Sequence, residues 1–354
     1  MTPGAGTNTG TEGAGTDTGT TPAPAALSEQ WKRWIVDNAA AGVSAADLSA
    51  ELVRRGLPAE QAADPLGLVG VEFLLQQVLR PERALRQKYE QLLGDLGKLD
   101  ALSGTALPER HDISAEEFFD QFYLRNRPVV LRGFAAGSGV LRWTPAALRE
   151  QFGTIQVQVQ TGRRTEPIWD VFLRGKTSTM PLAEYVDKVL AAGETNEFYL
   201  TANENFLAHD HERLILADVA FTEALLDVDQ RYQGTSLWLG PAGTISPLHR
   251  DRVNVLNVQT VGSKRITLID ACQLPKVYNQ QSYYSMVDVE RPDLERFPDF
   301  AGVTVRSAVL QPGDAVLIPI NWWHHLRALQ VSVSITFVNF RLDNTFGNRT
   351  FEPD

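Results

Sequence analysis

The stretch Ser246-Pro247-Leu248-His249-Arg250-Asp251 decides how the rest of the chain is interpreted. On an extended strand, residues i and i+2 point to the same face, so His249 and Asp251 would project together. An imidazole and a carboxylate on one face can supply two ligands to a metal ion. A His-x-Asp triplet is common by chance, however, and by itself it is more often structural. Non-haem Fe(II) oxygenases need a second histidine, which would have to come from a distant strand.

A second histidine is available further along the chain. The sequence Gln311-Pro312-Gly313-Asp314 indicates a tight turn, and the apolar run 315–318 after it indicates a buried strand. The run Asn321-Trp322-Trp323-His324-His325 follows directly. A histidine at the end of a buried strand could close the mouth of a barrel and complete the metal site. The alternative is a core histidine that only makes hydrogen bonds.

The combination of these segments is more specific than any one of them. His249-Arg250-Asp251 is followed after 12 residues by Lys264, and later by the Pro-Gly-Asp turn and the tryptophan–histidine run. Together they resemble the JmjC-type branch of the cupin superfamily, cupin-like domain 8, and in particular its asparaginyl hydroxylases. The resemblance covers about residues 110–345. It implies a double-stranded β-helix that uses Fe(II), 2-oxoglutarate and O2.

The resemblance also implies roles for individual residues. The metal ligands would be His249, Asp251 and His324, which leaves His325 in a supporting or structural position. Lys264 would pair with the distal carboxylate of 2-oxoglutarate, since a carboxylate taken into a barrel needs a cation and hydrogen bonds. Without the resemblance, Lys264 would be interpreted as a solvated lysine at a strand end.

Further side chains are implied in binding 2-oxoglutarate. Ser246 and Tyr199 would share the distal carboxylate with the lysine, although a buried structural tyrosine is an alternative for Tyr199. Asn339 would lie near the end of the co-substrate that binds the metal.

The chain departs from the hydroxylase pattern at two positions. Val255 stands where the hydroxylases have an asparagine. Asn257 has the same strand parity as the ligands and could take that role, whereas Asn254 would point outward on an unbroken strand. Arg341 replaces a tryptophan, and it could face substrate or simply lie on the surface.

The pattern after His111 is mainly β. Short strands separated by Gly/Pro turns suggest a barrel or sandwich, and the resemblance makes this a double-stranded β-helix (cupin/jelly-roll) barrel with flanking helices. The strands are expected at about 128–131, 155–160, 197–201, 236–239, 249–260, 264–269, 315–318 and 332–340.

A small all-α domain is expected before the barrel. Residues 1–25, almost all Gly, Thr, Ala and Pro, predict a disordered tail. Residues 26–108 form the helical domain, with Ser44 capping one helix and two longer helices at about 66–79 and 82–102. Residues 109–354 form the oxygenase domain.

Composition restricts the possible partners and compartment. The chain has 354 residues and a formal net charge of -10, so nucleic acid is an unfavourable partner. A single cysteine, Cys272, excludes an internal disulfide and fits a reducing compartment. No apolar run is long enough to span a membrane, and a basic, apolar signal peptide is missing, so a cytoplasmic location is expected.

The resemblance implies a dioxygenase that hydroxylates a C–H bond of a protein or peptide side chain. A free amino acid or small metabolite is an alternative substrate. An alternative from a different functional class is a non-catalytic cupin that binds a metal or ligand, because fold alone does not determine function. The helical domain could recruit the substrate or hold a homodimer together.

Overall fold

The computed structural model describes residues 27–40, 43–163, 176–202, 218, 222–227, 235–279 and 283–346. The predicted disordered tail, residues 1–25, lies outside these ranges. The chain divides into two compact units, Met1–Lys88 and Tyr89–Asp354. The sequence placed the division near residue 108. The structure instead divides within helix α5 (Val71–Leu102), because the C-terminal part of this helix packs on the second unit.

The first unit is helical. Its core consists of five buried residues, Ile35, Leu48, Leu52, Ala62 and Val69. The Ser44 side chain caps the second helix by accepting a 3.2 Å hydrogen bond from the Asp47 N–H, as its position before an acidic first turn predicts. The helices before α5 are α1 (Glu29–Ala40), α2 (Ala45–Arg54), α3 (Ala59–Ala62) and α4 (Pro65–Val69).

Helix α5 corrects the expectation of two long helices. The break falls at Gly70, where φ is +81°, and the helix then continues without interruption through Pro81. Glycine adopts this left-handed conformation without the steric cost that other residues meet, so Gly70 is a natural end for α4. Although α5 has 32 residues, it is not apolar enough to span a bilayer, and neither is any other helix among the described residues.

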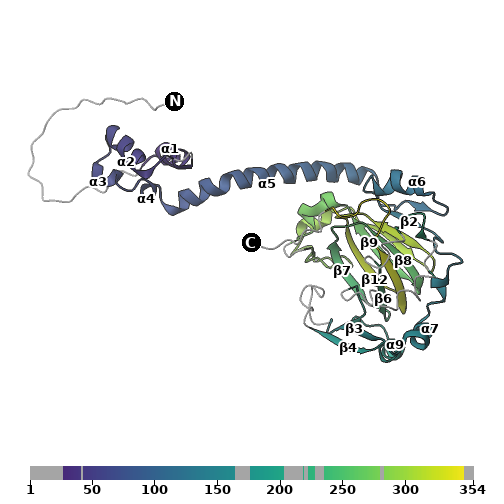
Figure 1. The fold of residues 1–354 in the computed structure, drawn as a ribbon. Helices are drawn as coiled ribbons and strands as arrows, with labels where there is room; N and C mark the ends of the chain where they lie inside the picture. The colour runs from purple at the N-terminus through teal and green to yellow at the C-terminus, as the bar shows by residue number, and fades with distance from the viewer. Residues whose placement is uncertain are drawn as a thin grey trace, which may run out of the picture. The chain divides into compact units, whose positions relative to one another are not determined.

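The second unit is built on two large sheets and a small one (Figure 1). The six-stranded sheet has the spatial order β1 (Glu109–Arg110), β2 (Val129–Leu131), β11 (Ala315–Ile318), β8 (Val255–Val261), β13 (Ser332–Phe337) and β6 (Thr235–Gly240). The four-stranded sheet has the order β10 (Arg306–Leu310), β9 (Lys264–Ile269), β12 (Trp323–Ala328) and β7 (Ile245–Arg250). The small sheet has the order β4 (Thr177–Pro181), β3 (Gln156–Thr161) and β5 (Phe198–Tyr199).

The two large sheets face each other. Lys264 at the start of β9 donates a 2.7 Å hydrogen bond to Ser334 on β13, which joins the sheets across the interior. One apolar cluster combines Val316 and Ile318 of the larger sheet with Ile266 and Leu326 of the smaller. Apart from the short parallel pair β1–β2, neighbouring strands in these sheets are antiparallel. The predicted jelly-roll barrel with flanking helices is therefore confirmed.

Helices and loops cover the outer faces of both sheets. Helices α7 (Pro145–Phe152) and α9 (Leu182–Ala191) pack against each other and add Leu148 and Tyr185 to the largest apolar cluster. That cluster also contains Leu256 and Ile335, which belong to the six-stranded sheet. The outer face of the four-stranded sheet is covered by residues near Phe297. Both sheets are thus buried on their outer sides, which leaves the space between them for the site.

The predicted strand 249–260 is in fact two strands. β7 ends at Arg250, residues 251–254 form a turn, and β8 begins at Val255 on the opposite sheet. The parity argument for an unbroken strand therefore fails beyond Asp251. Its clearest consequence is Asn254, which was expected to point outward but is only 1% exposed.

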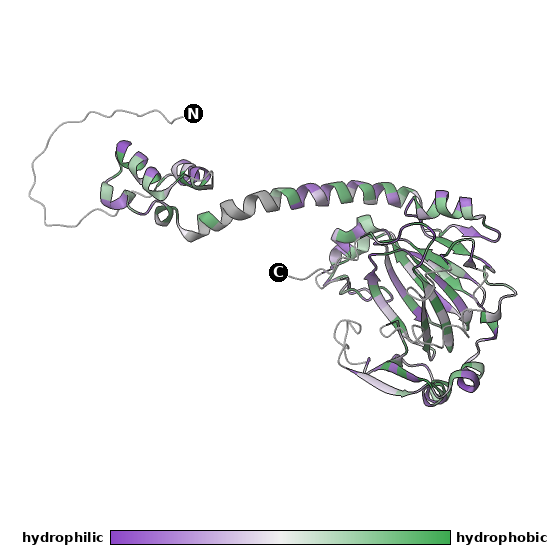
Figure 2. Cartoon of the chain, in the orientation of Figure 1, coloured by the Kyte–Doolittle hydropathy of each residue, from purple (hydrophilic) through white to green (hydrophobic). Residues whose placement is uncertain are grey.

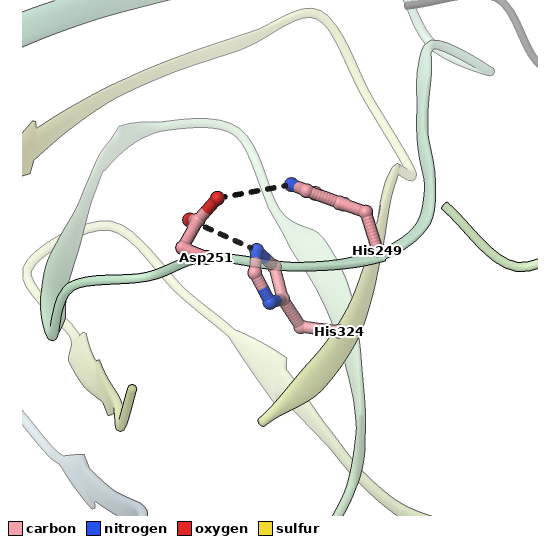
Figure 3. A group of neighbouring side chains, drawn as sticks. All are labelled: His249, Asp251 and His324. Atoms are coloured by element: carbon pink, nitrogen blue, oxygen red, sulfur yellow. Dashed lines mark ion pairs between the residues drawn. The ribbon is translucent and has the colours of Figure 1, made fainter. Parts of the chain in front are cut away.

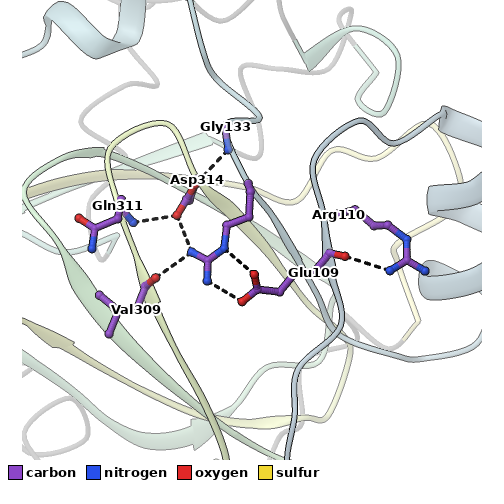
Figure 4. A network of polar contacts seen from close by, with 7 residues as sticks. Glu109, Arg110, Gly133, Val309, Gln311 and Asp314 are labelled. Carbon is purple, nitrogen blue, oxygen red and sulfur yellow. Dashed lines mark hydrogen bonds and ion pairs between the residues drawn. The ribbon is translucent and has the colours of Figure 1, made fainter.

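An arginine-centred network holds the Pro-Gly-Asp turn in place (Figure 4). Arg132 donates a 2.6 Å hydrogen bond to the Asp314 carboxylate and binds Glu109 through two nitrogens. Asp314 also accepts hydrogen bonds from the backbone N–H groups of Gln311 and Gly133. The turn that precedes β11 is thereby fixed to the segment after β2.

Candidate metal and co-substrate site

His249, Asp251 and His324 converge at one point inside the barrel (Figure 3). One ligand atom from each, a histidine nitrogen or a carboxylate oxygen, lies within 4.8 Å of the others. Asp251 faces both rings, at 3.5 Å from His324 Nε2 and 3.9 Å from His249 Nε2. The three donors thus form a group that could hold a metal ion.

Backbone hydrogen bonds orient both imidazoles. His249 Nδ1 lies 2.7 Å from the Pro247 carbonyl oxygen, and His324 Nδ1 lies 3.0 Å from that of Trp322. A carbonyl oxygen can only accept, so each Nδ1 carries the proton and each Nε2 presents a lone pair toward Asp251. Metal-binding histidines are usually oriented by such bonds.

The environment keeps His324 in its neutral form. The ring is 3% exposed, and burial, with the neighbouring His249 ring, lowers its pKa to about 4. An imidazolium has no lone pair, so a low pKa keeps the ligand available down to acidic pH.

Strand pairing brings the two histidines together. His249 on β7 lies directly opposite His324 on β12, and the ring centroids are 4.0 Å apart. Asp251 follows β7, and its carbonyl oxygen accepts a 2.8 Å hydrogen bond from the Asn321 N–H in the turn before β12. The long-range register therefore assembles the triad, and the backbone contact holds the carboxylate in place. His325, the next residue, points to the opposite side of the strand. It is not among the described residues that line the cavity.

Lys264 lies in the same barrel, 2% exposed. Its ammonium donates hydrogen bonds to Tyr199 Oη at 3.1 Å and to Ser334 Oγ at 2.7 Å. Among the described residues, no carboxylate lies within ion-pair distance of this nitrogen. Burial without a counter-charge lowers the lysine pKa to about 7. A buried cation of this kind is a favourable partner for a carboxylate that enters the barrel.

A cavity of about 340 Å³ connects the triad with this lysine. This volume is near the lower end of the range of roughly 300–1,000 Å³ that is common for ligand pockets, so the cavity suits a small acid. Among the residues singled out in the sequence, Ser246, Tyr199 and Asn257 line it together with Lys264 and the triad. Asn257 Oδ1 is buried without a hydrogen-bond partner in the described structure, and so remains available to a ligand.

Asn339 does not line this cavity among the described residues. Its side-chain amide donates a 2.8 Å hydrogen bond to the Asp227 carbonyl oxygen instead. Val255 does line the cavity, where the hydroxylases carry an asparagine. Asn254 faces away from it and bonds Asn344 and the Ile320 N–H. Arg341 is exposed.

Several residues in or beside the cavity were not predicted from the sequence. Ser334 accepts the hydrogen bond from Lys264, and Trp238 lines the wall. Tyr284 stacks on His249, with ring centroids 5.6 Å apart and planes at 20°. An isolated antiparallel β-bridge pairs Tyr284 with His249, so the loop that carries Tyr284 lies alongside the strand of this candidate metal ligand. A lone tyrosine in a loop gives no sequence signal, since only the bridge fixes its position.

Two cations lie close to the Tyr199 ring. The Arg163 guanidinium lies 5.4 Å from its ring centroid and the Lys264 ammonium 5.7 Å. Arg163 is fully buried and also donates a 2.6 Å hydrogen bond to the Ile245 carbonyl oxygen. These contacts hold the Tyr199 ring beside Lys264.

The donors present fit Fe(II) and a dicarboxylate co-substrate. Two imidazoles and one carboxylate on one side of an ion match the facial set of non-haem iron enzymes, which leaves positions open. The Asp251 side chain is 37% exposed, so the carboxylate is open to the cavity. The desolvated lysine and the unpaired Asn257 oxygen supply the polar partners that an acid needs at the other end.

Comparison with known proteins agrees with this geometry. A model of the family described as cupin-like domain matches residues 115–345. Lysine-specific demethylase 8 is 31% identical over 66% of this chain in Xenopus tropicalis, and 28% identical over 65% in Danio rerio. These alignments cover 53% and 57% of the relatives, so the chain spans about half their length. tRNA wybutosine-synthesizing protein 5 of Danio rerio is 26% identical over 67% of the chain and 76% of that protein.

Proposed function

The chain belongs to the cupin-like domain family, as its resemblance to the JmjC-type branch predicts, and we propose from this that it is an Fe(II)- and 2-oxoglutarate-dependent dioxygenase. Its substrate in this proposal is a C–H bond of a protein or peptide side chain. The observation that carries the proposal is the pairing, in one cavity, of a complete His/Asp/His triad with a buried lysine that has no acidic partner among the described residues.

The triad residues have defined tasks in this proposal. His249 and His324 present Nε2 to the iron because backbone carbonyl oxygens hold their Nδ1 protons. Asp251 supplies the carboxylate. Bound Fe(II) would supply the oxidative chemistry, in which O2 is the oxidant: one oxygen atom enters the succinate formed with CO2 from 2-oxoglutarate, and the other enters the hydroxyl group formed at a substrate C–H.

The far end of the cavity would bind the distal carboxylate of 2-oxoglutarate. Lys264 provides the cation, and it can exchange its present bond to Ser334 for one to the carboxylate. Tyr199 accepts a hydrogen bond from Lys264, and Ser246 also lines the cavity, so both could add hydroxyl groups. Desolvation makes each of these interactions stronger than it would be in water.

The substrate would enter on the side of Asp251 and Tyr284. Asp251 is the most exposed member of the triad, and the Tyr284 ring forms a wall over His249. A side chain inserted between this wall and the metal would bring its C–H bond to the reactive position. An extended peptide can deliver such a side chain while its backbone stays outside.

Charge favours a protein substrate over RNA. The frog and zebrafish relatives are named for lysine demethylation and another relative for tRNA modification, so both classes are represented. The formal charge of this chain is -10, and phosphate backbones are repelled by an acidic protein. We therefore place peptide hydroxylation first and keep RNA and free metabolites as outcomes of the test. The lone buried thiol of Cys272 and a requirement for Fe(II) also fit a reducing, cytoplasmic setting.

Binding can be tested without turnover. Anaerobic protein given Fe(II) and then 2-oxoglutarate should develop a weak visible charge-transfer band. His249→Ala and Asp251→Ala should lose metal affinity, because each removes a ligand. His111→Ala, which removes an exposed histidine outside the site, should bind as the wild type does. A fully metallated wild type without the band would favour a non-catalytic binding protein.

Turnover then identifies the substrate class. Peptide libraries, free amino acids and short RNAs should be compared by substrate-dependent succinate formation under air. Peptides are expected to stimulate succinate formation, and both ligand variants should lose at least about 100-fold. Stimulation by RNA or a free amino acid alone would replace the proposed substrate but leave the chemistry intact. Full activity in His249→Ala and Asp251→Ala would overturn the assignment of the metal site.

A further inference from the structure

Helix α5 carries an apolar stripe that the described structure leaves exposed. The side chains of Leu85, Tyr89, Leu92, Leu96 and Leu99 are 52%, 57%, 56%, 45% and 65% exposed. Apolar and polar stretches alternate along the described part of this helix (Figure 2). Contiguous apolar surface of this kind is uncommon on proteins that stay monomeric.

The spacing of the stripe is that of a helix made to pair with another helix. Successive members are 4, 3, 4 and 3 residues apart, which is the repeat of positions d and a in a coiled coil. A helix that packs on a globular surface usually needs a broader apolar face than this. The stripe is about 22 Å long at 1.5 Å per residue.

A different side of α5 packs on the barrel of its own chain. Gly97 is buried and lies next to Gln273, whose amide nitrogen would be in van der Waals contact, at 3.4 Å, with a Cβ added at this position. Asp100 forms a 2.8 Å ion pair with the buried Arg306. These residues lie beside the stripe and fix the helix on its own barrel. Because α5 is already helical in the single chain, dimerisation does not have to provide the free energy of helix formation, which short coiled coils normally need.

The charges beside the stripe identify its partner. Arg86 and Lys88 flank the N-terminal half, whereas Asp95 and Asp100 flank the C-terminal half. Two copies arranged antiparallel bring the basic half of one helix beside the acidic half of the other. Two parallel copies would not bring Lys88 of one helix beside Asp95 of the other, so neither charge would gain a partner.

We propose that residues 85–99 of α5 form an antiparallel homodimer interface with the same segment of a second copy. Leucines and Tyr89 fill the seam, and Lys88 of each copy pairs with Asp95 of the other. Asp95 now bonds the exposed Lys98 of its own helix at 2.9 Å, a weak contact that can be exchanged. The interface is short, so the expected dissociation constant is roughly 1–100 µM. This dimer is independent of the proposed chemistry.

Sedimentation equilibrium of the full-length protein tests the interface. The wild type should pass from the 39.2 kDa chain mass toward twice that value as its concentration rises from roughly 5 to 300 µM. Leu92→Glu/Leu96→Glu should stay monomeric, because it places four acidic groups in the seam. Leu190→Glu makes the same change at an equally exposed leucine on α9 and should dimerise normally. A monomeric wild type, or a dimeric double variant, would overturn the proposal.

Charge reversal tests the orientation. In the antiparallel dimer, Asp95→Lys should weaken association roughly three- to tenfold, since each new lysine meets Lys88 of the other copy. Adding Lys88→Glu should restore it. In a parallel dimer, where Lys88 and Asp95 do not meet, Asp95→Lys would leave association unchanged and Lys88→Glu would have nothing to restore. That result would overturn the antiparallel arrangement.

Discussion

At the scale of single residues, Lys264 shows how burial can prepare a binding site. Its ammonium is desolvated and bonded only to hydroxyl groups, so the charged form is disfavoured and the pKa falls to about 7. A carboxylate placed beside the ammonium would reverse this effect by favouring the charged form. The empty cavity and the loaded cavity should therefore hold different numbers of protons near neutral pH.

This difference predicts a pH dependence of 2-oxoglutarate binding. Below pH 7 the lysine is charged before binding, and affinity should be constant. Above pH 7 the free protein loses the proton that the complex requires, so the dissociation constant should rise up to about tenfold per pH unit. Calorimetric titration with Mn(II) in place of Fe(II), between pH 6 and 9, measures both this rise and the accompanying proton uptake.

The matched control is Lys264→Met, which keeps the apolar stem and removes the ammonium. This variant should bind 2-oxoglutarate weakly, and its dissociation constant should not rise above pH 7. Effects of pH on the metal would persist in this variant and can be subtracted. A pH profile in Lys264→Met that parallels the wild type would show that another group carries the dependence.

At the scale of elements, two short turns carry the chain from the four-stranded sheet to the six-stranded sheet. The turn at 251–254 carries the chain from β7 to β8 on the opposite sheet, and it leaves Asp251 facing the histidines. The Pro-Gly-Asp turn before β11 is fixed by Asp314, which accepts bonds from two backbone N–H groups and from Arg132. The first turn was not predicted, because apolar residues continue on both sides of it. The second was predicted correctly, since its signal is local.

Asp314→Ala should destabilise the barrel by about 2–4 kcal/mol. The carboxylate is 8% exposed, and its removal leaves two backbone N–H groups without their acceptor and takes one of several acceptors from Arg132. Glu109→Ala is the matched control, since it removes the other carboxylate on Arg132 at a 46% exposed position. It should cost less than about 1 kcal/mol. Urea unfolding of both variants measures the two values, and equal losses would contradict the different roles.

At the scale of the whole molecule, the chain consists of two units with separate cores. The candidate site lies entirely within the second unit, since the triad, Lys264 and the cavity residues all come from it. Ligands should therefore act on the stability of one unit and not on that of the other.

Thermal unfolding followed by calorimetry should show two transitions. Mn(II) with 2-oxoglutarate at about 100 times its dissociation constant adds about 2.7 kcal/mol to the barrel and should raise its transition by roughly 5–10 °C. Leu48→Ala removes a buried side chain from the helical core and should lower the other transition alone. One transition that responds to both changes would show that the units unfold together.

The sequence by itself determined the features that depend on local spacing. His249 and Asp251 are two residues apart, Ser44 caps its helix through a residue three positions on, and Gln311–Asp314 form a four-residue turn. The tertiary structure alone decided which groups meet across the barrel. Strand register sets His324 opposite His249, and the packing of two sheets leaves Lys264 without an acidic neighbour among the described residues. Local sequence sets the direction of a side chain, whereas its partners depend on which distant strands are buried together.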